Sequence, residues 1–488
     1  MNKRPALEYS WRKRLCVGCF VLLLPFGVRT MKAQDTSAQS NITGTQTNSA
    51  TPPVSHAKAK TPAAASEVSD TEETQVETQL RPFNLILPQD HLFGDWAGLL
   101  PKMQDAGITP NLSYTSNIAG NPVGGKSQGL AYCDNIGLSL QFDLKKIVGL
   151  DGGSFLISMS QRDGTSLTQK RVGNVFTIQQ VYGGQTFHLI DVAYQQKLFD
   201  DKLEFCVGRI AAGDDFLVSA YDYLFMQNGF CGNPVGIFFN APGMSAYPNA
   251  AWGIRVKVLP TARTYIMGGV YNGDATIRTD DNHGAGMSMN GPVFAMGEAG
   301  YINNGLSGDS PYIGHYKIGG WYDGNSYTDY NTLGYATPSS ASRGNWGLYG
   351  LFDQVVMPFG EPGSNRGWGV FGSVLASPDQ SVSQMPYFFT AGTAARGIWS
   401  SRPRDVAGFG VVFGQFSNDL QNAQQRQQIL NPAMSVQSHE SVLEWTYRFN
   451  MKQGAIFVQP DLQYIIRPGA AGQIGNALVL GCQVGINF

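Results

Sequence analysis

The chain has 488 residues, a formal net charge of −2 at pH 7, and only 14% charged residues, compared with about a quarter in typical soluble domains. Its 59 glycines and 11% aromatic residues are unusual for a soluble enzyme, and it lacks the basic excess of a nucleic-acid-binding protein, so we expect no nucleic-acid partner. Low charge with abundant glycine and aromatic residues is typical of a membrane β-barrel, in which apolar and polar side chains alternate along each strand.

The first 33 residues have the pattern of a secretory signal peptide. Lys and Arg cluster between residues 3 and 14, and the apolar stretch LCVGCFVLLLPFGV (15–28) follows them. This stretch is short for a membrane-spanning helix, so we predict a signal peptide over residues 1–33, cleaved after Ala33. An uncleaved membrane anchor is the alternative. Without residues 1–33, which carry seven Lys or Arg and one Glu, the net charge would be about −8.

The next segment, residues 34–80, consists mainly of Thr, Ser, Ala, Gln and Pro. It has almost no large apolar side chain and cannot bury enough surface to fold alone, so we predict a disordered periplasmic extension. Residues 81–108 are predicted to form an N-terminal helical segment at the periplasmic side, before a barrel at residues 109–488.

Short runs of alternating apolar and polar residues fill the rest of the chain, separated by clusters of Gly, Pro, Asn and Asp. Such alternation is typical of β-strands with two different faces. Sixteen runs are present, at residues 109–118, 135–144, 153–161, 188–198, 203–209, 251–258, 263–271, 292–301, 312–322, 346–357, 367–376, 385–393, 406–415, 438–449, 454–464 and 477–488. The predicted fold is all-β: a 16-stranded antiparallel transmembrane β-barrel with short periplasmic turns, long external loops and a short N-terminal helix.

The connections between the runs alternate in length, as expected for turns at one end of a barrel and loops at the other. The connections at residues 199–202, 259–262 and 450–453 are tight. The predicted external loops are long and rich in Gly, Asn and Asp, at residues 161–187, 210–250, 323–345 and 416–437. One connection breaks the rule, because residues 395–405 should form a periplasmic turn and yet are longer than the neighbouring external loop.

The run HESVLEWTYRF (439–449) shows how the two faces differ. Its odd positions from 443 onward carry Leu, Trp, Tyr and Phe, whereas Glu444 and Arg448 lie on the other face. A soluble β-sandwich also alternates in this way. The signal peptide, the aromatic strand ends and the terminal Phe488 favour lipid contact, because aromatic girdles mark the membrane interfaces of such barrels.

Several stretches resemble the carbohydrate-selective porin (OprB) family. They are LFGDWAGLLPKMQDAGITPNLSYTSNIAGNPVGG (92–125), the segment from GRIAAGDDFLVSAYDYLF to AAWGIRVKV (208–258), PDLQYIIRPG (460–469) and NALVLG (476–481). The resemblance covers about residues 90–488 and implies a sixteen-stranded pore of the Gram-negative outer membrane that passes glucose and similar sugars. It also implies that a helix at residues 95–107 lies at, or plugs, the periplasmic side. Members often carry a cysteine near the position of Asp222 that could pair with Cys231, and that cysteine is absent here.

The C-terminal Phe488 on an alternating strand resembles the signal that the bacterial barrel-assembly machinery recognises. The expected partners are therefore monosaccharides, outer-membrane lipid and that machinery, with monomer and trimer left open.

A sugar is neutral and rich in hydroxyl groups, so its path should offer balanced charges beside an aromatic ring. The pore-lining candidates are inward-parity or loop-mouth residues: Arg209, Asp214, Asp215, Arg255, Lys257, Trp321, Glu444, Arg448 and Asp461. Each could instead be a wall residue that only stabilises the barrel, and Asp214 with Asp215 could simply form a turn.

No catalytic, cofactor or metal site is predicted. The segment GWGVFG (367–372) matches the dinucleotide-binding pattern, but it lies within a predicted strand rather than between a strand and a helix. Two alternatives remain for the function. One is a general or ion-selective diffusion porin on the same barrel, and the other is an outer-membrane enzyme or adhesin that acts through its external loops.

Overall fold

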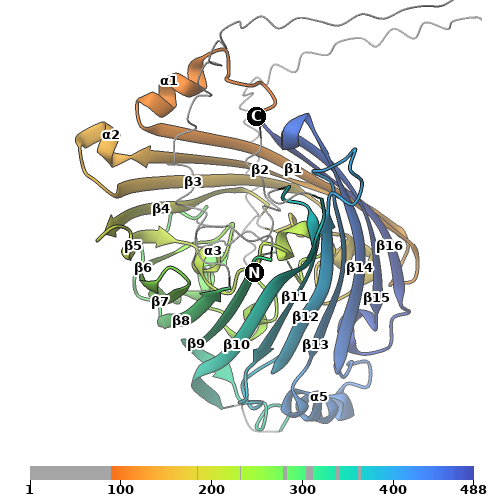
Figure 1. The fold of residues 1–488 in the computed structure, drawn as a ribbon. Coiled ribbons are helices and arrows are strands. Elements are labelled where there is room, and N and C mark those ends of the chain that lie inside the picture. The colour runs from red at the N-terminus through yellow and green to blue at the C-terminus, as the bar shows by residue number, and fades with distance from the viewer. Residues whose placement is uncertain are drawn as a thin grey trace, which may run out of the picture. The chain divides into compact units, whose positions relative to one another are not determined.

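The computed structural model describes residues 90–183, 185–230, 232–278, 283–303, 312–335, 340–360 and 364–488. The segments predicted as signal peptide and periplasmic extension (1–33 and 34–80) lie outside the described residues, as do residues 81–89 and Cys231. The described part is a closed antiparallel barrel in which each strand pairs with its neighbours in sequence and the first strand pairs with the last (Figure 1).

The sixteen strands confirm all sixteen predicted segments. They are β1 (Ile108–Val123), β2 (Gly129–Asp143), β3 (Gly153–Gly164), β4 (Phe187–Leu198), β5 (Leu203–Ile210), β6 (Ala251–Thr261), β7 (Thr264–Asn272), β8 (Val293–Ile302), β9 (Gly314–Thr328), β10 (Ala341–Pro358), β11 (Gly367–Ala376), β12 (Tyr387–Arg396), β13 (Val406–Gln415), β14 (His439–Met451), β15 (Ile456–Ile466) and β16 (Ala477–Asn487).

The helices are short and lie before the first strand or in the connections. They are α1 (Leu99–Asp105), α2 (Leu144–Val148), α3 (Ala212–Asp215), α4 (Ile237–Asn240) and α5 (Asn418–Leu430). Single π or 3₁₀ turns occur at Thr168–Val172, Asp222–Leu224, Ala275–Arg278, Lys452–Gly454 and Pro468–Ala470. Among the described residues, no helix has both the length and the apolar character needed to cross a membrane.

One of the two largest boundary differences concerns the predicted external loop at residues 323–345. Strands β9 and β10 continue well into it, and Thr328 pairs with Ala341, so only residues 329–340 connect them. The Gly, Asn and Asp residues there resemble a loop in sequence. They pair as strands because the inward side chains of this stretch bind the barrel interior, as when Tyr327 donates a hydrogen bond to the Asn240 carbonyl at 3.0 Å.

Helix α5 is a second difference, because no helix was predicted beyond residue 109. Its sequence NDLQNAQQRQQIL has no continuous apolar stripe, so the sequence shows neither the alternation of a strand nor the periodicity of an amphipathic helix. Ser417 caps the helix by accepting hydrogen bonds from the N–H groups of Asp419 and Leu420. Arg426 fixes it against the β9–β10 connection by donating to the carbonyls of Tyr330 and Leu333.

Alternation along the strands produces two chemically different faces. On β6, Ile254, Val256 and Val258 are exposed on the outer surface, whereas Arg255 and Lys257 are each only 4% exposed and point inward. On β14, Trp445 is exposed while Glu444 is completely buried. The predicted assignment of these faces is confirmed, and the outer face is the apolar one that a hydrocarbon layer requires.

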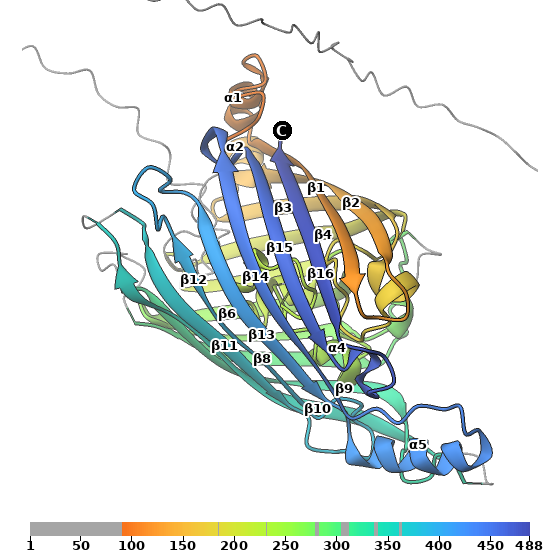
Figure 2. The same cartoon turned by 90° about the vertical axis from the view of Figure 1, so that its right-hand side faces the viewer.

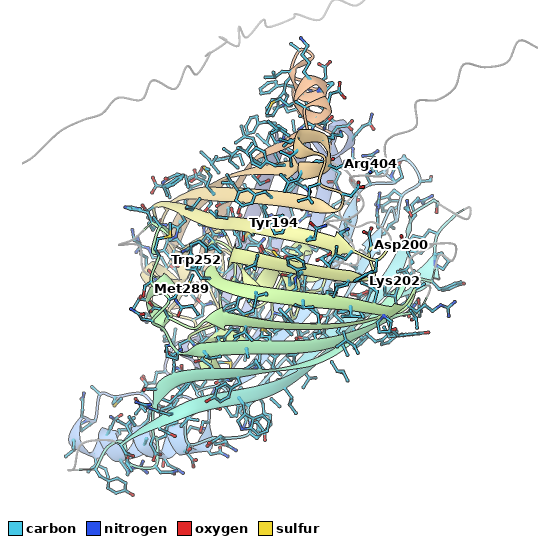
Figure 3. The ribbon with its side chains drawn as sticks, turned by 90° about the vertical axis from the view of Figure 1, so that its left-hand side faces the viewer. Tyr194, Asp200, Lys202, Trp252, Met289 and Arg404 are labelled. Atoms are coloured by element: carbon cyan, nitrogen blue, oxygen red, sulfur yellow. The ribbon has the colours of Figure 1, made fainter. Side chains whose placement is uncertain are left out.

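The two ends of the barrel differ as predicted. Asp200 and Lys202 of the β4–β5 turn and Arg404 of the β12–β13 turn lie at one end, while Trp252 and Met289 lie at the other (Figure 3). Residues 199–202 and 452–455 form tight turns at the first end, whereas residues 165–186 and 211–250 form long loops at the second. The β12–β13 turn, residues 397–405, is again the long exception.

Helix α1 lies beyond the strand ends, beside the C-terminus (Figure 2). The N–H of Phe488 donates to the Leu112 carbonyl at 2.9 Å, and the N–H of Leu92 donates to the Asn487 carbonyl at 2.8 Å. The rings of Phe93 and Phe488 are 5.8 Å apart. The last residue of the chain is therefore held in the barrel rim between β1 and the segment that precedes α1.

Candidate functional site

The barrel interior is narrowed by the β5–β6 loop, residues 211–250, which folds inward. Its large side chains Phe216, Leu217, Tyr221, Phe225 and Phe230 are completely buried. Short elements within it, α3 and α4, make the loop compact (Figure 1).

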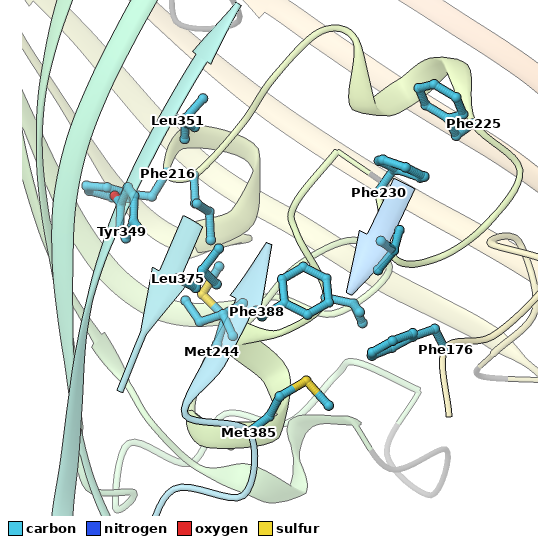
Figure 4. Packing of buried hydrophobic residues seen from close by; sticks show 14 of the residues in the cluster. Phe176, Phe216, Phe225, Phe230, Met244, Tyr349, Leu351, Leu375, Met385 and Phe388 are labelled. Atoms are coloured by element: carbon cyan, nitrogen blue, oxygen red, sulfur yellow. The ribbon is translucent and has the colours of Figure 1, made fainter. Parts of the chain in front are cut away.

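One side of the loop packs on an apolar part of the inner wall. Phe225 and Phe230 stack with ring centroids 4.3 Å apart, and Tyr221 stacks on Phe371 of β11 at 5.3 Å. The β3–β4 loop joins this cluster through Phe176, whose ring meets Phe388 of β12 edge-on at 5.5 Å (Figure 4). The inner wall at β10–β13 is thus closed by a hydrophobic core rather than open to water.

Inward-pointing charged side chains hold the backbone of this loop. Glu444 accepts hydrogen bonds from the N–H groups of Met226 at 2.6 Å and Gln227 at 3.3 Å. On the opposite wall, Glu298 accepts from the N–H of Leu217 at 2.9 Å. The remaining contacts of this kind are Asp323 with the Gly243 N–H, Lys317 with the Val218 carbonyl, and Arg448 with the Tyr223 carbonyl.

The other side of the loop faces an open cavity against the wall formed by β1, β2, β3 and β16. Its volume is about 760 Å³, within the range of pockets that hold small organic ligands. The wall offers mainly hydroxyl and amide groups, from Asn111, Ser113, Thr115, Asn135, Ser139, Ser158 and Gln483. The loops contribute Gln180, Tyr182, Asp214, Asn228, Tyr247 and Asn249.

Three of the lining residues form a connected group. The Arg162 Nε donates to the Asn135 Oδ1 at 3.2 Å, and the Asn135 Nδ2 donates to the Tyr247 hydroxyl at 3.0 Å. The guanidinium carbon of Arg162 lies 5.1 Å from the centre of the Tyr247 ring, which is a cation–π arrangement. Tyr247 is 39% exposed and lines the cavity, so part of a ring that Arg162 and Asn135 hold in place remains accessible.

The sequence comparisons agree with this architecture. Residues 127–488 match the family model described as "Carbohydrate-selective porin, OprB family". This chain belongs to that family. As an OprB-family porin, it is a sugar-diffusion channel of the Gram-negative outer membrane.

Two curated relatives and one solved structure are similar to this porin over most of its length. Porin B of Pseudomonas aeruginosa is 25% identical over 422 residues, which cover 80% of this chain and 90% of the relative. The putative porin QuiX of Acinetobacter baylyi is 26% identical over 432 residues, 81% of this chain and 93% of the relative. The high-pH structure of Pseudomonas putida OprB aligns with a TM-score of 0.75 at 24% identity, covering 82% of this chain and 99% of that one.

Of the nine residues that the sequence suggested for the OprB-family pore, Asp214 lines the cavity. Two others, Arg255 and Asp215, belong to a buried ion cluster with Glu204: Arg255 pairs with Glu204, and its other nitrogen lies 3.2 Å from Asp215. Arg209 donates to the Ile190 carbonyl at 3.0 Å, and Lys257 lies over the Tyr265 ring.

The remaining four lie beneath the inward loop or in the core. Glu444 and Arg448 hold the loop backbone, as described above. Asp461 accepts a hydrogen bond from Gln463, which itself donates to the Ile178 carbonyl of the β3–β4 loop. Trp321 is 4% exposed and belongs to the apolar cluster. Sugar contact by these residues stays a prediction, and their geometry favours a role in positioning the loops.

The sequence did not single out Arg162, Asn135 or Tyr247. The third predicted strand ended at residue 161, one position before Arg162. Asn135 was placed correctly on an inward face but is uncharged and so resembled many other polar wall residues. Tyr247 lies in a loop without periodicity, and no sequence signal marked it.

Proposed function

We propose that monosaccharides such as glucose diffuse through the cavity between β1–β3 and the inward loop, and that residues 211–250 set its width. The observation that supports this proposal is the group formed by Arg162, Asn135 and Tyr247 in a cavity whose lining combines amide and hydroxyl side chains with apolar ones. This composition suits a neutral ligand with many hydroxyl groups.

The chemistry of passage follows from these side chains. Each sugar hydroxyl that leaves water needs a donor or acceptor, and Asn and Gln side chains supply both. The exposed face of the Tyr247 ring offers a surface for the apolar C–H face of a pyranose. Sugars are uncharged, so neither Arg162 nor the protonation state of Asp214 strongly holds or repels them. The transport is passive, and the protein performs no bond chemistry and needs no cofactor.

The outer surface and the chain ends support the proposed setting. The apolar outer face contacts lipid, the short turns face the periplasm, and Phe488 presents the rim strand to the barrel-assembly machinery. The cavity is formed within one chain, so passage through it requires no second subunit, and both a monomer and a trimer are compatible with it.

Planar-bilayer recordings with glucose test the proposed path. We expect glucose to reduce the wild-type current and expect Tyr247→Ala to need about five- to tenfold more glucose, because a contact contributing about 1 kcal/mol is lost. Tyr247→Phe, which keeps the ring, should show a smaller effect. The control is Tyr322→Ala, which removes a lipid-facing tyrosine.

Unchanged glucose block in Tyr247→Ala, with normal single-channel conductance, would place the sugar path elsewhere. A strongly ion-selective current that glucose does not reduce in the wild type would instead favour a general or ion-selective porin.

A further inference from the structure

The unusually long β12–β13 turn, residues 397–405, lies across the end of the adjacent β14–β15 hairpin. The Arg404 Nη1 donates to the Gln453 carbonyl at 2.6 Å, and the Arg402 Nη2 donates to the Asn450 carbonyl at 3.3 Å. The turn therefore does not project freely into solvent. It forms a shelf on the barrel rim, at the end labelled by Arg404 in Figure 3.

Buried polar contacts hold the shelf in place. Asp405 is 2% exposed and accepts two hydrogen bonds from Arg402, at 2.7 and 2.9 Å, and one from the Asn450 N–H at 2.9 Å. The Tyr447 hydroxyl donates to the same carboxylate at 3.2 Å. At the start of the turn, Arg366 donates twice to the Gly397 carbonyl, at 2.9 and 2.7 Å.

A groove of about 710 Å³ separates the shelf from the outer, lipid-facing surface of β14 and β15. Its walls are the side chains of Trp399, Tyr447, Phe449, Met451 and Val458, with Arg402 and Asp405 at its edge. Trp399 is 61% exposed even though the turn around it is well anchored. An exposed indole on a fixed support, facing other apolar side chains, is suited to holding an apolar chain.

Cationic groups lie beside this apolar groove. Arg404 and Lys452 form no ion pair among the described residues, and Lys452 is exposed on the adjacent β14–β15 turn. Arg402 lies over the Phe449 ring at 5.8 Å. The site therefore combines an apolar surface at membrane depth with positive charge at the membrane boundary.

We propose that this groove binds an anionic phospholipid of the periplasmic leaflet. The acyl chain lies along Trp399, Phe449 and Met451, and the phosphate lies near Arg404 and Lys452. Charge complementarity selects this occupant, because each Lys or Arg near an anionic lipid surface contributes about 1 kcal/mol to attraction, whereas a plain aromatic girdle requires no headgroup charge. The inference rests on the proposed barrel orientation and goes beyond sugar transport.

Native mass spectrometry of the delipidated, detergent-purified barrel tests this proposal with added phosphatidylglycerol and phosphatidylcholine. We expect the wild type to retain phosphatidylglycerol preferentially. The double variant Arg404→Gln/Lys452→Gln should bind it roughly thirtyfold more weakly, since two cations, each contributing about 1 kcal/mol, are lost. Trp399→Ala should weaken both lipids. The matched control is Lys202→Gln, which removes an exposed cation from the β4–β5 turn at the same end (Figure 3).

The outcomes separate the possibilities. Equal binding of the two lipids by the wild type, or an equal loss in Lys202→Gln, would overturn a specific site at the shelf. Competition by millimolar inorganic phosphate without any effect of Trp399→Ala would show a phosphate site rather than a lipid site and would also overturn it. Glucose block of the current should stay unchanged in the same variants. Lipid binding and sugar transport are therefore tested by independent measurements, and either proposal can fail without the other.

Discussion

Removing the carboxylate of Glu444 should release the inward loop, and the size of the effect can be worked out from its contacts. The buried carboxylate accepts hydrogen bonds from the N–H groups of Met226 and Gln227. Leaving a buried N–H group without its acceptor costs about 1–3 kcal/mol, so Glu444→Ala, which leaves two, should destabilise the closed loop by about 3 kcal/mol or more. Because 1.4 kcal/mol is a factor of ten, local opening should become at least roughly a hundredfold more frequent. Glu444→Gln keeps a neutral acceptor, and we expect roughly a tenfold effect.

Hydrogen–deuterium exchange of the barrel in detergent measures this opening directly. The peptide containing Met226 and Gln227 should exchange about a hundred times faster in Glu444→Ala. Glu440→Ala is the matched control, since Glu440 is equally buried on the same strand but accepts from Val175, Phe176 and Gly469. That variant should accelerate exchange at Val175 and Phe176 instead. Unchanged exchange at Met226 and Gln227 in Glu444→Ala, with altered glucose block, would refute the tether and make Glu444 a direct sugar contact.

Three further predictions follow from other contacts. Arg255→Ala leaves Glu204 and Asp215 without their buried cation and should lower the free energy of unfolding by about 3–5 kcal/mol. Urea unfolding in detergent measures this change, and a loss below about 1 kcal/mol would contradict a stabilising buried ion pair. Burial, with smaller effects from Asp191 and Asp215, raises the pKa of Asp214 well above its ordinary value. As the pH rises through that raised pKa, the cavity should gain a negative charge and conduct cations more selectively. Reversal potentials in a KCl gradient should show this increase in the wild type, and an equal increase in Asp214→Asn would exclude Asp214 as its source. Phe488→Ala should reduce the amount of barrel assembled in the outer membrane several-fold while refolding into detergent changes little, and equal losses in both assays would assign Phe488 a role in stability alone.

The strands of this porin could be predicted from sequence because alternation is enforced on every one of them by the two environments they separate. The strand at 439–449 illustrates this, since Trp445 must contact lipid and Glu444 must not. Helix α5 could not be predicted, because it lies in an external connection and contains mostly Gln and Asn. Its few apolar residues show neither the two-residue period of a strand nor the 3.6-residue period of a helix.

The pore-lining residues were harder to predict than the fold, because inward-facing charged residues are the first candidates that a sequence offers for a polar pore. In this barrel several of them, such as Glu444 and Arg448, bind the backbone of the inward loop. The cavity itself is lined largely by uncharged groups such as Asn135 and Tyr247. Which polar face opens to water depends on where residues 211–250 pack, and that packing is set by contacts between distant segments such as Tyr221 with Phe371.

Liposome swelling tests most directly whether sugars cross the water-filled interior of this barrel. Proteoliposomes are diluted into isotonic glucose or sucrose, and the swelling rate is followed by light scattering against protein-free liposomes. Rapid swelling in glucose and clearly slower swelling in the larger disaccharide is the expected result, because the proposed path runs beside a loop that fills part of the barrel interior. If a barrel shown to be folded gave swelling in glucose no faster than that of protein-free liposomes, sugar passage through its interior would be contradicted.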